Sequence, residues 1–255
     1  MSNRWKIILI AVAFNLTFEY SLRGFVNLKL VPGLILLLGV TYFSLFTMVE
    51  DLIVRYKLKD YQLMLLAFFY GTIYMTWASG SIFYQPNWRG INIGLLLIIN
   101  IVWWGAIQGV LTFYLANKIS PRDWNHPQMS KVGWAVNLIV SLVCLRIFQL
   151  SPVVPHGSGQ GQVTIFVILI ISLVLTIISI KKNQETINFE SNKVLDTLAW
   201  GSWAVFGLSA IFNKGGELVN SSILGSANLK IIILWTLIVA LAMLIFRIVK
   251  KPIPV

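Results

Sequence analysis

The sequence predicts an all-α integral membrane protein, built as a single bundle of about eight transmembrane helices with both termini in the cytosol. The chain of 255 residues is 57% hydrophobic and only 11% charged, whereas soluble domains carry about 25% charged residues. Its mean hydropathy is +0.80. Several apolar runs approach the roughly 20 residues that cross a hydrocarbon core.

The hydropathy pattern predicts eight spans in one domain covering residues 1–255, because no connection is long enough to separate two domains. The first span resembles a signal peptide, with Arg4 and Lys6 before an apolar run, but it lacks a small-x-small cleavage site. We expect it to stay as an uncleaved span. The alternative is seven spans, with this helix lying in the membrane interface. The predicted spans are residues 5–22, 31–54, 61–84, 91–116, 132–151, 163–181, 196–213 and 230–248.

The basic residues test this count independently, because positive charges favour the cytosolic side. Fourteen fall in the segments assigned to the cytosol, five in the outer segments, and Arg146 alone lies inside a span. The net charge of +11 is therefore distributed as topology requires, and we expect no nucleic-acid partner. The expected location is the plasma membrane.

Residues 91–116, the fourth span, carry two small-xxx-small glycine pairs in an apolar segment. Gly90, Gly94, Gly105 and Gly109 fall within roughly 100° of arc on an α-helix. Glycine stripes let transmembrane helices approach closely. We therefore expect this helix in the centre of the bundle.

The third span carries an aromatic and hydroxyl-bearing stripe along one predicted helical face. Its members are Tyr70, Tyr74, Trp77, Ser81 and Tyr84. A tyrosine hydroxyl facing lipid has no hydrogen-bond partner and costs free energy, so the stripe should face protein or a cavity. Aromatic packing and a ligand-lining wall are both compatible with it.

Ionisable residues within spans are candidates for function because their burial is costly. Glu19 lies near the outer end of the first span, where Arg23 is spaced for an i,i+4 ion pair. Arg146 in the fifth span is at a depth that matches Glu19. It could bridge to Glu19, bind an anion, or extend its guanidinium to the interface.

Glu50 and Asp51 close the second span on the cytosolic side. We expect that helix to continue through Arg55, with Asp51 paired to Arg55. A Mg²⁺ site on the two acids is the less favoured alternative, since adjacent helical residues diverge by about 100°.

The sequence lacks the motifs of several kinds of metal, diphosphate and nucleotide site. Cys144 is the only cysteine, and His126 and His156 fall in loops on opposite sides of the membrane. The chain contains no H-E-x-x-H, no D-D-x-x-D cluster and no Walker A sequence. We expect no metal site, and the sequence indicates no cofactor.

These features favour a transporter or binding protein for a small amphipathic or lipid-like molecule, neutral or anionic. Two alternatives stay open: an enzyme acting on lipid, with Glu19, Glu50 or Asp51 as base, and a structural subunit of a larger membrane complex. Expected partners are membrane lipids, a hydrophobic small molecule and a membrane protein. The candidate ligand contacts are Tyr70, Tyr74, Trp77, Ser81, Asn100, Trp104, Gln108, Arg146 and Glu19.

Overall fold

The computed structural model describes residues 2–125, 129–151, 154–181, 189–213, 227–250 and 252–255. The described chain folds into helices joined by short connections. They are α1 (Asn3–Arg23), α2 (Asn27–Leu30), α3 (Pro32–Tyr56), α4 (Asp60–Trp77), the 3₁₀ helix η1 (Ser81–Phe83), α5 (Ile93–Leu97), the π-helix η2 (Ile98–Leu111), α6 (Thr112–Ile119), α7 (Lys131–Gln149), α8 (Gly159–Lys181), α9 (Lys193–Phe212) and α10 (Ala227–Val249).

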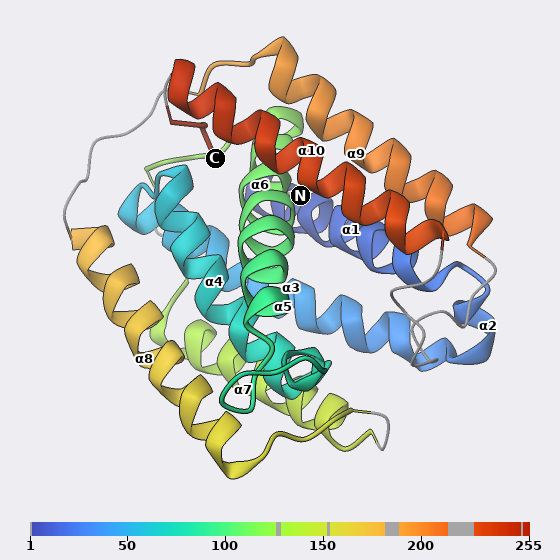
Figure 1. The fold of residues 1–255 in the computed structure, drawn as a ribbon. Coiled ribbons are helices and arrows are strands. Elements are labelled where there is room, and N and C mark those ends of the chain that lie inside the picture. Colours follow the sequence, from blue (N-terminus) through green and yellow to red (C-terminus); the bar gives the residue numbers. More distant parts are fainter. Residues whose placement is uncertain (1, 126–128, 152–153, 182–188, 214–226, 251) are drawn as a thin grey trace.

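Four helical stretches form the inside of the bundle, and four form its outside (Figure 1). The inner stretches are α1, α3, α4 and the continuous run α5–η2–α6. On one side α7 packs against α3 and α8 packs against α4; on the other, α9 packs against α1, and α10 packs against η2 and α9. The first helix is thus a full member of the bundle rather than an interfacial helix.

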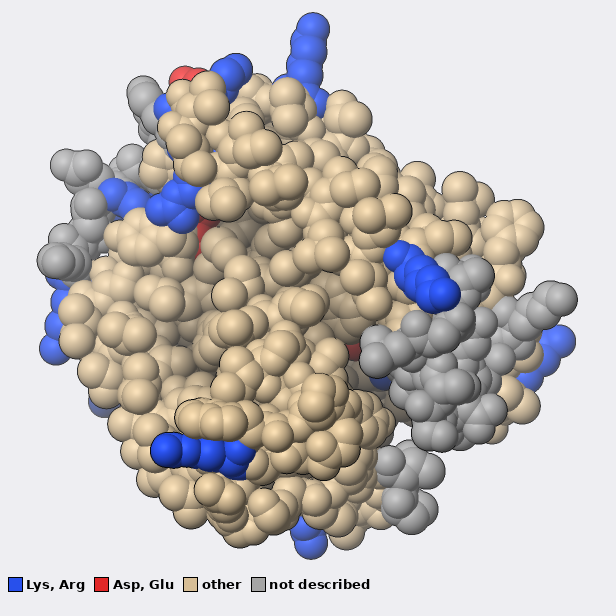
Figure 2. Space-filling view, in the orientation of Figure 1, with Lys and Arg blue, Asp and Glu red and all other residues tan. Residues whose placement is uncertain are grey.

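Seven helices are long and apolar enough to cross a membrane, which confirms a multi-pass, all-α membrane protein. The remaining long helix, α4, has 18 residues and carries the polar-aromatic stripe. It packs along η2 inside the bundle but is not among the seven helices that are apolar enough to cross a membrane, so the prediction of eight spans stays a prediction. The face shown in Figure 2 carries few Lys, Arg, Asp or Glu side chains, as expected for a surface in contact with lipid.

The two ends of the described chain meet at the same end of the bundle. The Asn3 side-chain amide donates to the carbonyl oxygen of Pro121 at 3.2 Å, and the Arg122 guanidinium donates to the backbone oxygen of Val255. This arrangement agrees with an even number of spans, and it is the end that the distribution of basic residues assigns to the cytosol.

The fourth span departs from the expected α-helix, because residues 98–111 form a π-helix with i→i+5 hydrogen bonding. Of the two glycine pairs, only one acts as predicted. Gly105 faces Met64, and Gly109 faces Leu63 and Ala67 on α4, so this pair packs the central helix against its neighbour. Gly90 and Gly94 lie apart from that contact, since Gly90 precedes the helix in a turn.

The third span ends earlier than expected, and the predicted stripe is divided. Helix α4 stops at Trp77, and the chain turns through Gly80, whose φ is +62°, into η1. Ser81 and Tyr84 therefore do not continue the face formed by Tyr70, Tyr74 and Trp77. The expectation of one helical face over all five residues is wrong.

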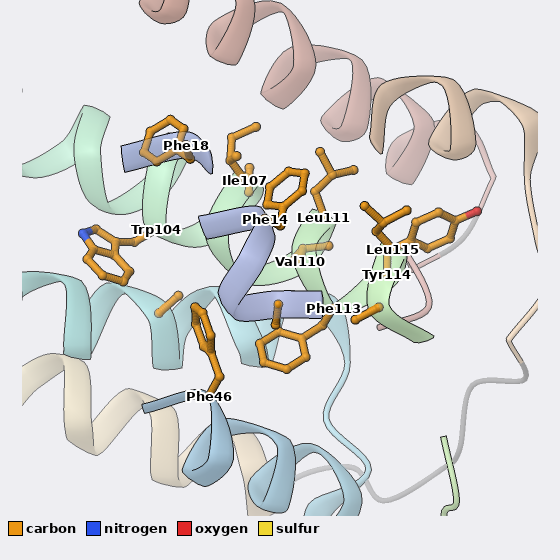
Figure 3. Close-up of a cluster of buried hydrophobic side chains, with 14 of the residues drawn as sticks. Phe14, Phe18, Phe46, Trp104, Ile107, Val110, Leu111, Phe113, Tyr114 and Leu115 are labelled. Atoms are coloured by element: carbon orange, nitrogen blue, oxygen red, sulfur yellow. The ribbon is translucent and has the colours of Figure 1, made fainter. Parts of the chain in front are cut away.

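The apolar core lies where α1, α3 and η2–α6 meet (Figure 3). Phe46 of α3 contacts Phe113 of α6 edge to face, with ring centroids 5.6 Å apart. Phe18 of α1 contacts Trp103 of η2 and Phe206 of α9 in the same manner. These aromatic contacts fix the inner helices around a set of polar side chains.

Candidate functional site

A buried carboxylate joins three inner helices. One oxygen of Glu19 accepts a hydrogen bond from the Tyr42 hydroxyl at 2.5 Å, and the other accepts from Arg23 at 2.8 Å. The Tyr42 oxygen accepts in turn from the Gln108 amide at 3.2 Å. The predicted Glu19–Arg23 pair is therefore present, and Glu19 also links α1 through α3 to η2.

Trp104 is the centre of the aromatic part of this cluster. It is 2% exposed. Its ring lies 5.3 Å from that of Tyr70, 5.0 Å from that of Tyr74 and 6.1 Å from that of Tyr42. Three helices thus contribute rings to one packed group, and the two stripe tyrosines face protein as expected.

Asn100 and Trp104 fit against α4 where that helix has a glycine. The Asn100 amide donates to the Thr72 hydroxyl at 2.7 Å. A Cβ on Gly71 would lie 2.6 Å from the Asn100 Oδ1 atom and 2.7 Å from the Trp104 ring, closer than atoms pack. Among the described residues, the Asn100 Oδ1 atom and the Tyr70 hydroxyl are buried and accept or donate no hydrogen bond.

The other three predicted contacts lie outside this cluster. Trp77 lines a cavity at the outer end of the bundle. The Ser81 hydroxyl is 2.9 Å from the Ser79 hydroxyl in the turn after α4. Arg146 is exposed on α7 and donates to Gln149 at 2.7 Å. No ion pair joins Arg146 to Glu19 in the described part of the chain. The Glu19 carboxylate is instead hydrogen-bonded to Tyr42 and Arg23.

The outer cavity has a volume of about 230 Å³. It lies between the outer ends of α4 and α7, η1, the segment before α8, and the first turns of α8. Its polar groups are Thr76, Gln149, His156 and Gln162, and its apolar and aromatic groups are Trp77, Phe83, Ile165, Phe166 and Leu169, with Gly157 between them. The lining holds no Asp, Glu, Lys or Arg.

Along α8 the cavity wall changes from polar to apolar, whereas on the other walls polar and aromatic residues are neighbours: Thr76 precedes Trp77 in α4, and Phe83 packs against Gly157 beside His156. Gln162 is in the first turn of α8, whereas Leu169 lies seven residues further along the same helix, about 10 Å deeper. His156 and Gln149 are close to the outer end, before α8 begins and where α7 ends. A molecule in the cavity would therefore meet amide, imidazole and aromatic groups near the outer end and aliphatic side chains further along α8.

The acids at the opposite end of the bundle are held by basic side chains. Glu50 accepts from Arg122 at 2.7 and 2.8 Å. Asp51 accepts from Arg55 at 2.9 Å, as predicted, and from the Trp134 indole at 2.8 Å. Because each carboxylate already has these donors, the pair does not present a shared oxygen site for Mg²⁺.

No group of three or more His, Cys, Asp or Glu side chains gathers in the described part of the chain, which does not include His126. The residues missed from the sequence are Tyr42, Gln149 and His156. The argument that a tyrosine in a span needs a partner applies to Tyr42 as it does to Tyr70. Nothing in the local sequence indicated that Gln149, at the end of α7, and His156, before α8, would line the same cavity as Trp77.

Comparison of the chain with protein-family models, with curated proteins and with solved structures finds no match.

Proposed function

We propose that the protein binds or carries a small amphipathic molecule, whose polar end occupies the outer cavity. The observation that carries the proposal is the lining of that cavity, which combines four uncharged hydrogen-bonding side chains with five aromatic or aliphatic ones. Ligand sites are mostly apolar, with a few placed polar groups. The lack of charged side chains in the lining favours a neutral polar end.

The size of the cavity limits the ligand. Ligand pockets span about 300–1,000 Å³, and this cavity of about 230 Å³ is smaller. It therefore accommodates a small molecule or one end of a longer one. Phe166, which is 65% exposed, lines the cavity from α8. The apolar remainder of a longer molecule would leave past Phe166 along the lipid-facing surface of α8.

The central cluster has a supporting role in this proposal. Trp104, Tyr70 and Tyr74 are packed against each other, and Glu19 is bonded to Tyr42. The aromatic contacts of Tyr70 and Tyr74 hold α4 against η2 and α3, and α4 presents Thr76 and Trp77 to the cavity two and three residues beyond Tyr74. Of the candidates from the sequence, those in the central cluster thus position the wall and Trp77 forms it, whereas Ser81 and Arg146 do neither.

Native mass spectrometry of the protein extracted gently from its own membrane tests the proposal. Phe166→Ala removes an exposed wall residue with little risk to folding, and Phe212→Ala is the matched control, since Phe212 is 73% exposed on α9 and does not line the cavity. We expect a defined small-molecule adduct on the wild type and the control. Loss of one aromatic contact should reduce it about tenfold in Phe166→Ala. Equal adducts on all three proteins, or none on the wild type, would contradict the proposal.

A further inference from the structure

A second cavity lies on a different face of α8, beneath a hairpin at the outer end. Its volume is about 330 Å³. One wall is the hairpin and α5, and the other is α8. The lining residues are Trp88, Arg89, Ile91, Ile93, Leu96, Val163, Thr164, Val167 and Ile168. We call it the hairpin groove; apart from Thr164 and Arg89, its walls are apolar or aromatic.

The hairpin is a tight two-residue turn. Trp88 and Ile91 exchange backbone hydrogen bonds of 2.7 and 3.2 Å, and the two residues between them have positive φ, +51° at Arg89 and +80° at Gly90. Positive φ at both central positions defines a type I′ turn. Residues with a Cβ avoid this region, so Arg89 is held in an unfavourable backbone conformation, which is a feature of functional sites.

The turn is fixed to α8 by a contact between two glycines. A Cβ on Gly90 would lie 2.6 Å from the backbone nitrogen of Gly161, and a Cβ on Gly161 would lie 2.6 Å from the oxygen of Gly90. The Thr164 hydroxyl lies 3.2 Å from the backbone oxygen of Arg89 and 2.9 Å from that of Gln160, and shares its one hydrogen between them. The hairpin therefore holds Arg89 at the end of the groove without relying on its side chain.

The Arg89 guanidinium has capacity to bind an anion. Its carbon lies 4.6 Å from the centroid of the Trp88 ring, and it forms no ion pair with a carboxylate of the described residues. Arginine presents up to five donors in a planar fork that suits phosphate. Tryptophan beside it is typical of the membrane interface.

We propose that the hairpin groove binds an anionic phospholipid of the adjacent leaflet. Its phosphate accepts hydrogen bonds from Arg89, and one acyl chain lies between Ile93 and Leu96 on one side and Val163 and Val167 on the other. The charge of the single cation at the mouth and the apolar walls behind it complement the two parts of such a lipid. The groove shares no lining residue with the outer cavity, so this inference does not depend on the proposed function.

The test is native mass spectrometry of the whole protein released from nanodiscs of mixed phosphatidylglycerol and phosphatidylcholine. Arg89→Gly removes the guanidinium and relieves the positive φ, so the fold should be as stable as the wild type or more so. Lys230→Ala is the control, because Lys230 is an exposed cation near the start of α10, outside the groove.

We expect the wild type and Lys230→Ala to retain phosphatidylglycerol in preference to phosphatidylcholine. Arg89→Gly should lose that preference, with retention falling about tenfold and thermal stability unchanged or raised. Equal retention by Arg89→Gly, or no preference in the wild type, would overturn the inference. Complete release of the bound lipid by inorganic phosphate would also overturn the inference, because it would show an anion site that holds no acyl chain. A lipid-free dimer that the Arg89→Gly substitution dissociates would overturn it too.

Discussion

Glu50 and Arg122 form a two-fold hydrogen-bonded ion pair, at 2.7 and 2.8 Å, in which both side chains are only 1% exposed. The pair joins α3 to the segment that follows α6. The Arg122 guanidinium also donates to the backbone oxygen of Val255. The backbone nitrogen of Arg122 donates to the side-chain oxygen of Asn117 at 2.9 Å. One arginine thus holds three parts of the chain at the end assigned to the cytosol.

Breaking this pair should destabilise the protein strongly. Glu50→Gln leaves a buried guanidinium without its counter-charge, and the cost of such a change is about 3–5 kcal/mol. Thermal unfolding in detergent should therefore shift to clearly lower temperature. Lys118→Gln serves as the control, because the side chains of Lys118 and its partner Asp196 are 28% and 21% exposed, and an exposed pair contributes about 0–1 kcal/mol. Equal shifts for the two variants would contradict the account.

Tyr42→Phe tests the link between Glu19 and Gln108. Removing the hydroxyl takes a donor from the Glu19 carboxylate and an acceptor from the Gln108 amide, and each unsatisfied buried group costs about 1–3 kcal/mol. We expect a measurable loss of thermal stability. Tyr56→Phe on the same helix is the matched control, since Tyr56 is 37% exposed. A Tyr42→Phe protein as stable as the control would show that the link is dispensable.

Gly71→Ala tests the close approach of α4 and η2. The added methyl would lie 2.6 Å from Asn100 and 2.7 Å from Trp104, and such overpacking costs about 1–3 kcal/mol. At Gly39 in α3 a Cβ meets nothing within 4 Å, so Gly39→Ala should be neutral or stabilising by up to about 1 kcal/mol. Unfolding temperatures of the two variants should move in opposite directions or differ clearly; a neutral Gly71→Ala would refute the contact.

Single-cysteine labelling tests the topology. In a Cys144→Ala background, the exposed positions Gln160 and Lys57 lie at opposite ends of the bundle. A membrane-impermeant maleimide should label Gln160→Cys in intact cells and Lys57→Cys only after the cells are permeabilised. The reverse pattern would invert the assigned orientation, and labelling of both in intact cells would exclude an odd number of crossings between them.

The spans could be predicted because they depend on composition along the chain. All eight predicted segments correspond to helices, and the Glu19–Arg23 and Asp51–Arg55 pairs followed from i,i+4 spacing. Such features are local, so the sequence contains them in full. The pairing of Glu50 with Arg122 joins residues 72 positions apart, and no local pattern indicates it.

Two errors have a common physical origin. The stripe through Tyr84 and the four-glycine face both assumed α-helical periodicity throughout. The chain leaves α4 after Trp77, where Gly80 packs against Pro155, and Gly90 lies in a turn before the fourth span rather than in its helix. Both departures are turns that contact distant parts of the chain, Gly80 against Pro155 and Gly90 against Gly161, and a periodicity argument does not include such contacts. The outer cavity was not predicted for the same reason, because its walls come from separate parts of the chain.

The most direct test of the central claim is photo-crosslinking in the native membrane. A benzophenone-bearing amino acid at position 166 places the reactive group in the wall of the outer cavity, and the same residue at position 212 places it on an exposed part of α9 that does not line the cavity. We predict one defined small-molecule adduct at position 166 and only a mixture of bulk lipids at position 212. The same mixture at both positions would contradict the claim that the cavity binds a specific amphipathic molecule.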